Sequence, residues 1–463
     1  MKLVFVHGWS VTNTDTYGEL PEALSRHAPE ELELGIEHIY LGKYISFHDE
    51  VTVDDIARAF EQARKDQLGK DTNFSCITHS TGGPVIRAWV KKYYGDKRKL
   101  EHLPLRHLIM LAPANHGSSL AQLGKARVGR MKAWWAGVEP GQGVLNWLEL
   151  GSDGQRDLNL AWMNYKFAEL GFYPIVITGE TIDKKLYDYL NSYTAEKGSD
   201  GVVRVAAANL NYRHIVLSQN IRQSPFTVKD NGDTFEVYPL ELRKTDPAVS
   251  QPCALEVIPK ASHSGEKMGI MRSVKAAGPG KPPVVEAILN SLEVSDADEY
   301  TILSKEMELR TGETQSRNKY AMVVVRVTDD QGNQVRDYDL YLLAGNQYSP
   351  GILPKGFFVD KQKNRINNNH LTYYLNATRM LKIKDGKLGF RVIARPSEGF
   401  SYYRPGEFHS DDIPLENLIK ENETLLLDIV LKRHVDVNTF RLSPATDPRE
   451  DFKDDEPGNI RVS

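Results

Sequence analysis

Short, largely apolar runs that alternate with helical segments constrain the fold of this chain more than any other feature. The runs span residues 3–6, 36–41, 73–79, 105–111, 173–178 and 254–259. Helical periodicity lies between them: residues 53–67 place Ile56 and Phe60 on one side, and Thr52 can cap the start. Strands that are apolar along most of their length and alternate with helices are typical of a parallel sheet covered on both faces. The sequence therefore predicts an α/β core.

Residues 73–88 combine one of these strands with a sharp turn at Ser80 and the opening of a helix. Gly82 and Gly83 follow the serine and let the backbone fold tightly. This pattern indicates a nucleophile elbow, in which a strained turn lifts a serine hydroxyl clear of the sheet. Thr78 stands where the pattern has glycine, so an ordinary strand-to-helix turn remains the alternative interpretation.

A serine hydroxyl becomes a good nucleophile only when a base takes its proton and a carboxylate orients that base. In hydrolases with a nucleophile elbow, the chain order is serine, acid, histidine. Asp200 lies in an Asp-Gly turn after the run 173–178, and His263 lies on a loop of small residues after the run 254–259. Both are expected at the carboxyl ends of strands, where sheets of this kind carry their sites.

Each of these assignments has a competitor. Asp200 can be read as a simple turn former, and Glu180 and Asp183 are rival acids nearer to the strand end. His214 is the other histidine between Asp200 and the end of the core. It falls in a strand-like run at 212–217, so we expect it to be a packed side chain.

An oxyanion needs hydrogen-bond donors that are already in place. The N–H of Thr81, which follows the expected nucleophile, is one candidate. The other is the N–H of Trp9, because the His7-Gly8 pair ends the first strand. A plain turn at this pair is the alternative.

The sequence motifs together resemble one enzyme family. They read Val-Phe-Val-His-Gly, Thr-His-Ser-Thr-Gly-Gly, Leu-Ala-Pro-Ala-Asn-His-Gly-Ser, Ser-Asp-Gly-Val-Val and Ser-His-Ser-Gly. This set is similar to the lipase branch of the α/β-hydrolases, near bacterial lipases and the PGAP1-like and lecithin-cholesterol-acyltransferase-like esterases. The resemblance implies an α/β-hydrolase fold, Asp200 as the acid, and cleavage of acyl esters of lipids or phospholipids. Bacterial lipases often bind calcium beside the histidine; here the loop offers Glu266, so we expect no metal and no cofactor.

A long segment interrupts the alternation before the run at 173–178. We expect a lid at about 117–165, because apolar residues and tryptophans recur there at helical spacing with Lys125, Arg127 and Arg130 between them. A basic amphipathic helix of this kind can meet a lipid surface. A cap helix packed on the core is the alternative. The catalytic domain is thus placed at residues 1–293.

From about residue 294 the pattern changes to short strands. Those expected include 320–328, 337–343, 379–383, 390–394 and 424–431, with a hairpin turn at 384–387. We predict a β-rich, sandwich-like domain at 294–445. Residues 446–463 have the acidic composition of a poorly ordered tail. Paired aspartates at 329–330 and 411–412 are expected to be solvated turns and not calcium loops.

Composition limits the partners. Across 463 residues the net charge is only -4, which gives no global attraction to nucleic acid, and the two cysteines exclude a cysteine zinc site. The first residues already read as a strand, so we expect synthesis in the cytoplasm without a signal peptide. A lipase core joined to a β-domain also resembles type VI secretion effectors. That resemblance implies signal-independent export and an immunity or chaperone partner.

The sequence therefore predicts a serine carboxylester hydrolase that acts on acyl lipids at a membrane surface. Acyl transfer to an alcohol would use the same residues and remains an alternative. A protein of another class, which binds partners through the β-domain on an inert α/β scaffold, is the third reading.

Overall fold

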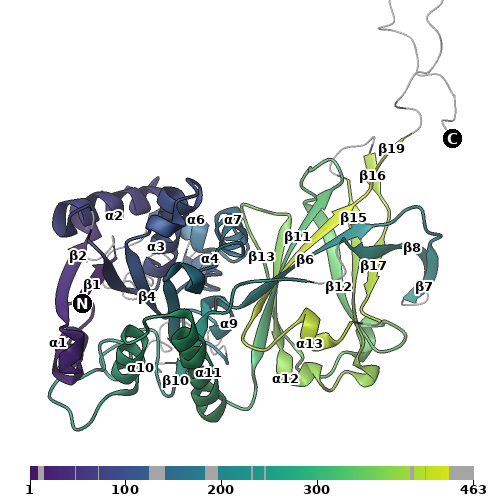
Figure 1. Cartoon of the computed structure of the whole chain (residues 1–463). Coiled ribbons are helices and arrows are strands. Elements are labelled where there is room, and N and C mark those ends of the chain that lie inside the picture. Colours follow the sequence, from purple (N-terminus) through teal and green to yellow (C-terminus); the bar gives the residue numbers. More distant parts are fainter. Residues whose placement is uncertain are drawn as a thin grey trace, which may run out of the picture.

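The protein is described by a computed structural model (Figure 1). It describes residues 1–8, 15–46, 48–70, 72–124, 141–182, 197–230, 233–243, 247–396, 401–411, 413–436 and 439. The centre of the expected lid, residues 125–140, and the expected acidic tail lie outside them. In the described ranges, no helix is both long and apolar enough to cross a membrane.

A sheet of six strands forms the centre of the first half, in the order β10-β5-β4-β3-β1-β2. Its strands are β1 (Lys2–His7), β2 (Gly35–Tyr40), β3 (Phe74–His79), β4 (Leu105–Leu111), β5 (Tyr173–Gly179) and β10 (Ala254–Ile258). All neighbours run parallel. Each of the apolar runs is one of these strands, which confirms the predicted α/β core.

Helices cover both faces of this sheet (Figure 1). They are α1 (Leu20–His27), α2 (Val53–Leu68), α3 (Gly82–Val90), α4 (Ala121–Gly124), α6 (Gln142–Leu148), α7 (Asp153–Trp162), α9 (Val205–Ala208), α10 (Pro283–Leu292) and α11 (Ala297–Thr314). One face packs α2, α3 and α7 around buried Phe60 and Trp89. The other packs α1, α10 and α11 around Leu24 and Ile288. Thr52 caps α2 in a reciprocal capping box with Asp55, as its sequence predicts.

A second, mixed sheet of eleven strands forms the other half. Its strands are β6 (Tyr212–Gln219), β7 (Phe226–Asp230), β8 (Asp233–Leu242), β9 (Ala248–Val249), β11 (Tyr320–Asp329), β12 (Asp337–Ala344), β13 (Phe358–Lys363), β14 (His370–Asn376), β15 (Leu388–Arg395), β17 (Gly406–His409) and β18 (Thr424–Leu431). A small ribbon pairs β16 (Ser401–Tyr403) with β19 (Arg433–Val435). Two short helices, α12 (Ala377–Met380) and α13 (Leu415–Leu418), lie between strands.

The two ends of this sheet share one core, as expected for a sandwich-like fold. Val323 of β11 and Leu375 of β14 belong to the same buried cluster as Leu340 of β12. The hydroxyl of Tyr373 on β14 donates to the Leu340 carbonyl at 2.5 Å. The sheet therefore bends over its own apolar face.

The second sheet takes strands from both sides of residue 294. Strands β6 to β9 leave the first half after Asp200 and return before β10, and β6 pairs with β18, 212 residues further on, at Tyr212 and Thr424. Conversely, Met307 of α11 is buried with the first sheet. The boundary expected at residue 294 therefore does not follow the division between the sheets. The reason is that long-range strand pairing leaves no local sequence signal.

One predicted strand of the second half is wrong. Residues 379–383 were expected to be extended, but α12 ends at Met380 and a turn follows. The Asn376 side chain accepts a hydrogen bond from the Arg379 N–H and caps this helix. The turn at 384–387 consequently joins α12 to β15 and does not connect two hairpin strands.

Candidate active site

The candidate site lies where the strand order of the first sheet reverses. β1 is hydrogen-bonded to β2 on one side and to β3 on the other, so the chain departs in opposite directions from the ends of β1 and β3. Ligands of open α/β sheets bind at such a point, outside the carboxyl ends of the strands. Ser80 follows the last residue of β3, and Gly8 follows the last residue of β1.

Ser80 forms a strained turn between β3 and α3. Its φ of 52° is a left-handed conformation that costs a non-glycine residue of the order of 1 kcal/mol or more. The Ser80 N–H donates to the Leu111 carbonyl at 3.0 Å, which ties the turn to the end of β4. This is the geometry of a nucleophile elbow, and the residue is 6% exposed.

Thr78 fits the elbow because of the glycine that follows the serine. A Cβ atom added at Gly82 would lie 3.2 Å from the Thr78 Cβ, which is closer than most such contacts in proteins. The first turn of α3 therefore rests on Thr78. The elbow has the usual glycine two positions after the serine, at Gly82. Two positions before the serine, the Thr78 side chain occupies the space that a glycine would leave empty.

Asp200 and His263 are brought together by the loops after β5 and β10, which are neighbouring strands. The His263 Nδ1 lies 2.8 Å from the Asp200 Oδ2. A backbone hydrogen bond of 3.0 Å from the His263 N–H to the Asp200 carbonyl holds the two loops in register. Both side chains are buried, at 1% exposure for Asp200 and 7% for His263.

The other oxygen of the Asp200 carboxylate is also occupied. Its Oδ1 accepts hydrogen bonds from the N–H groups of Val202 at 2.9 Å and Val203 at 2.8 Å. Gly201 supplies the tight turn, with a φ of 97°. The Asp-Gly-Val-Val sequence therefore folds the backbone around its own carboxylate and leaves Oδ2 directed at the histidine.

The rival acids do not share this arrangement. Glu180 accepts a hydrogen bond at 2.6 Å from the N–H of Ser316, in the segment that joins α11 to β11. Burial raises the pKa of Glu180 above its usual range. Asp183 lies outside the described residues. Asp200 is the carboxylate that the structure places against His263.

His214 is on β6 in the second sheet. Its Nε2 lies 2.9 Å from the Oδ2 of Asp428 on β18. The side chain thus belongs to an ion-pair cluster between strands, in keeping with the expected packed role.

His79 is a residue that the sequence interpretation missed. Its Nε2 lies 3.0 Å from the backbone carbonyl oxygen of His263, and the two imidazole rings are 4.6 Å apart. Burial and the neighbouring His263 lower the pKa of His79 well below its ordinary value, so the ring is neutral and donates Nε2–H to the carbonyl. His79, which directly precedes Ser80, therefore connects the elbow to the His263 loop. The local sequence carries no signal for a contact between residues 184 positions apart.

Of the expected oxyanion donors, only Thr81 is described. It is the N-cap of α3, and its own N–H lies at the helix start, where amides have no partner within the helix. Trp9 lies outside the described residues. His7, before it, contacts His38 at 2.9 Å between Nε2 and Nδ1, and burial lowers the pKa of His7 to about 3.

The loop after β4 holds the Asp200 loop from one side. The Ser118 hydroxyl donates to the Val202 carbonyl at 2.6 Å. The Asn115 amide donates to the Ala208 carbonyl at 2.7 Å, and the Asn115 Oδ1 accepts from the buried guanidinium of Arg87. Burial lowers the pKa of Arg87 to about 10.

The second sheet holds the same loop from the other side. The Tyr374 hydroxyl on β14 lies 2.8 Å from the Lys197 carbonyl and 3.2 Å from the Gly198 carbonyl. Arg204 stacks on the Tyr374 ring at 4.2 Å and pairs with Asp360 on β13 at 2.6 Å. The β-rich half is therefore part of the scaffold of the site.

The histidine loop does not present its carboxylate to the site. Glu266 lies 3.6 Å from the guanidinium of Arg272. Among the side chains that the structure describes, no group of three or more His, Cys, Asp or Glu could hold a metal ion.

Two solved structures resemble this chain over its whole length. Phospholipase PlaB from Legionella pneumophila shares 42% sequence identity with a TM-score of 0.85, and the match covers 100% of both chains. The same phospholipase in complex with thio-NAD shares 42% identity with a TM-score of 0.83, covering 97% of this chain and 98% of that one. No family model and no curated protein matches the sequence.

Proposed function

Because this chain belongs to the same family as phospholipase PlaB, we propose that it is a carboxylic ester hydrolase that releases fatty acids from phospholipids. Its residues supply the parts of a serine hydrolase. Ser80 is the nucleophile, His263 is the general base, and Asp200 orients the histidine. The observation that carries this assignment is the 2.8 Å contact between His263 Nδ1 and Asp200 Oδ2, beside the strained turn at Ser80.

In the first step, His263 Nε2 takes the Ser80 proton while the serine oxygen attacks the ester carbonyl carbon. The tetrahedral intermediate collapses when the imidazolium returns the proton to the departing glycerol oxygen. An acyl-serine remains. Water, activated by the same histidine, then attacks the acyl-serine and releases the fatty acid.

The Asp200 carboxylate supports this cycle in two ways. It fixes His263 in the tautomer that carries the proton on Nδ1, which leaves Nε2 free to act as base. It also stabilises the imidazolium that forms. The two backbone N–H groups that donate to Oδ1 hold the carboxylate in place, so that Oδ2 faces the histidine.

The negative charge on the attacked carbonyl oxygen needs donors close to Ser80. We propose the Thr81 N–H as one donor, since the positive end of the α3 dipole favours an oxyanion there. The Trp9 N–H is proposed as the second on the strength of its place after β1. Export of the protein and an immunity or chaperone partner stay predictions.

Lipid mass spectrometry tests the activity and identifies the substrate together. Purified protein is incubated with mixed phospholipid vesicles, and the products are compared with those from Ser80→Ala. We expect free fatty acid and lysophospholipid with the wild type, and at least a thousandfold less with the variant, since removal of a triad nucleophile costs orders of magnitude. Equal release by both proteins would rule out Ser80 as the nucleophile.

A further inference from the structure

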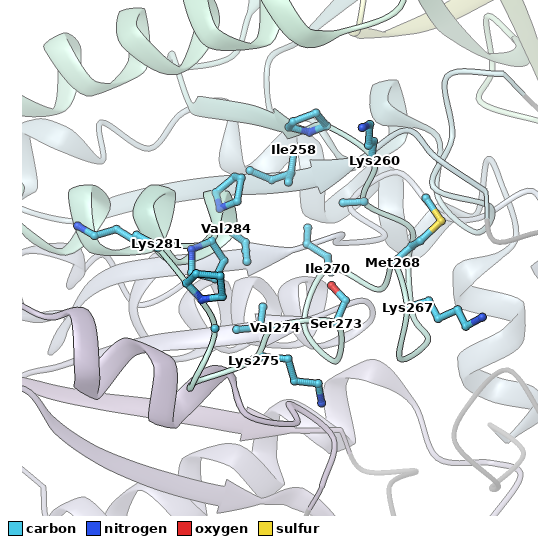
Figure 2. Close-up of a pocket in the computed structure, with 17 residues that line it drawn as sticks. Ile258, Lys260, Lys267, Met268, Ile270, Ser273, Val274, Lys275, Lys281 and Val284 are labelled. Atoms are coloured by element: carbon cyan, nitrogen blue, oxygen red, sulfur yellow. The ribbon is translucent and has the colours of Figure 1, made fainter.

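A pocket of about 420 Å³ lies beside the loop that carries His263 (Figure 2). The chain between the end of β10 and the start of α10 forms most of it. The apolar part of its lining consists of prolines together with Ile258, Met268, Ile270, Val274 and Val284. Neither Ser80, Asp200 nor His263 lines this pocket.

The pocket concentrates positive charge. Four lysines line it, at positions 260, 267, 275 and 281, and this fully described lining contains neither aspartate nor glutamate. Lys275 pairs with Glu19 at 2.9 Å. In the part of the chain that the structure describes, the other three have no carboxylate within 4.0 Å. The chain as a whole has a net charge of -4, so the cluster is a local reversal of sign.

The lysines do not converge on one point. In Figure 2, the side chains of Lys267, Lys275 and Lys281 extend outward in different directions from the pocket. A small anion is bound by groups that converge on it. Diverging ammonium groups around an apolar hollow instead match an extended surface that carries many negative charges.

The pocket and the catalytic histidine share one loop. Lys260 and Lys267 flank His263, and the loop is closed by hydrogen bonds from the Ser262 N–H to the Met268 carbonyl at 2.8 Å and from the Ile270 N–H to the Ser262 carbonyl at 2.9 Å. A surface that contacts Lys260 and Lys267 therefore contacts the loop that carries the histidine.

We propose that this lysine-rimmed pocket is the surface by which the protein docks on anionic phospholipid headgroups of a membrane. The inference rests on the proposed function, because it supplies the route by which a phospholipid bilayer meets His263. A lysine close to an anionic membrane strengthens binding by about fivefold. The three unpaired lysines, 260, 267 and 281, together contribute roughly 100-fold.

Vesicle sedimentation tests the docking surface. The Ser80→Ala variant is used so that the lipid is not consumed, with vesicles of phosphatidylcholine alone or mixed with phosphatidylglycerol. We expect tighter binding to the mixed vesicles, and a loss of roughly 100-fold when the three unpaired lysines become glutamine. The corresponding triple arginine variant, which keeps the charge, should bind as before.

Matched controls distinguish binding at this pocket from a general effect of removing positive charge. Glutamine at three exposed lysines outside the pocket, Lys305, Lys355 and Lys382, should leave vesicle binding within about threefold of the unsubstituted protein. The proposal is overturned if the pocket variant binds like its parent, or if the control variant loses as much. It is also overturned if inorganic phosphate raises the melting temperature in a lysine-dependent way while anionic vesicles do not bind.

A soluble substrate keeps this test apart from the proposed function. With Ser80 intact, the pocket variant should hydrolyse p-nitrophenyl butyrate as fast as the wild type. Failure of every protein to hydrolyse that ester would count against the esterase assignment, whereas loss of vesicle binding alone bears only on the docking surface.

Discussion

Asp200 is the residue whose surroundings define the site, because its two carboxylate oxygens have different hydrogen-bond partners. Oδ1 is fixed by the Val202 and Val203 amides, and Oδ2 faces His263. Glu180, by contrast, is engaged by the Ser316 N–H. The structure therefore separates two acids that the sequence left as rivals.

This separation predicts unequal effects of two isosteric changes. Asp200→Asn should lower kcat by about 10³- to 10⁴-fold, because the amide favours the wrong histidine tautomer. Glu180→Gln should change kcat by less than about threefold. Steady-state kinetics on p-nitrophenyl butyrate measures both, and a larger loss with Glu180→Gln would transfer the acid role to that residue.

His79 is expected to position the catalytic histidine through its hydrogen bond to the His263 carbonyl. His79→Phe keeps a ring but removes the donor, so kcat should fall about tenfold with KM unchanged. His79→Gln can donate through its amide and should recover most of the loss. If the phenylalanine variant keeps full kcat, the contact is only structural.

At the residue scale, the members of the candidate site that the sequence points to are those with a local signature. Ser80 sits in an elbow pattern, Asp200 in an Asp-Gly-Val-Val turn, and His263 among small residues. His79 and Tyr374 act through contacts with backbone carbonyls far away in the chain. A single sequence contains no pattern for such contacts, because the carbonyl acceptor is the same for every residue type.

Among the elements, β14 has the clearest connection to the site. Its Tyr374 hydroxyl contacts the Lys197 and Gly198 carbonyls at the start of the Asp200 loop. The β-rich half, predicted to be a separate domain, thus holds the Asp200 loop in place. The first sheet alone would leave this loop supported on one side.

Tyr374→Phe tests this connection. The variant should lose about 1 kcal/mol of unfolding free energy, as for a buried hydrogen bond, and its kcat should fall by about three- to tenfold because the Asp200 loop loosens. Tyr373→Phe is the matched control on the same strand, since the Tyr373 hydroxyl contacts the Leu340 carbonyl in the β core. It should lose similar stability but keep kcat; equal kcat in both variants would contradict the link.

Helices and strands were predicted correctly where a whole segment is buried. Prediction failed where a strand pairs with another strand that is far away in the sequence. The apolar runs of the first sheet, the helix α2 and the strand β18 lie where the sequence places them. The four-residue helix α12 was missed, although Asn376 is a recognisable N-cap, because one turn has too little periodicity to distinguish it from a strand. The transfer of β6 to β9 into the second sheet depends on pairing with β18, which only the tertiary structure reveals.

For the whole molecule, buried charge joins the two halves. Asp428 on β18 contacts His214 of β6, Arg326 of β11 and Arg156 of α7. Burial opposes ionisation of Asp428, but the His214 hydrogen bond and the two guanidinium charges outweigh it and hold its pKa well below the usual range. This cluster fixes α7 of the first half to the second sheet.

The molecule should lose stability between pH 7 and pH 5. Burial lowers the pKa of His7, His116 and His370 to about 3. These histidines stay neutral in the folded protein. In the unfolded chain, where a histidine has a pKa of about 6.5, they gain protons below that pH. Stability is therefore complete above about pH 6.5 and falls as the pH drops towards 3, by about 1.4 kcal/mol per pH unit for each histidine.

His370 allows this linkage to be measured. Neither of its ring nitrogens has a hydrogen-bond partner in the described part of the chain, so His370→Phe should be tolerated. Urea unfolding at pH 7 and pH 5 should show about 2 kcal/mol less loss in this variant than in the wild type. The exposed His102, changed to glutamine, should leave the loss unaltered; an equal loss in all three proteins would contradict the assignment.

Activation of Ser80 by the Asp200–His263 pair is tested most directly by covalent labelling with a fluorophosphonate. Intact-mass and peptide mass spectrometry should find one adduct, on Ser80, and labelling should be at least a hundredfold slower in His263→Ala. An unlabelled wild type that still cleaves phospholipid vesicles, or an adduct on another residue, would contradict the claim.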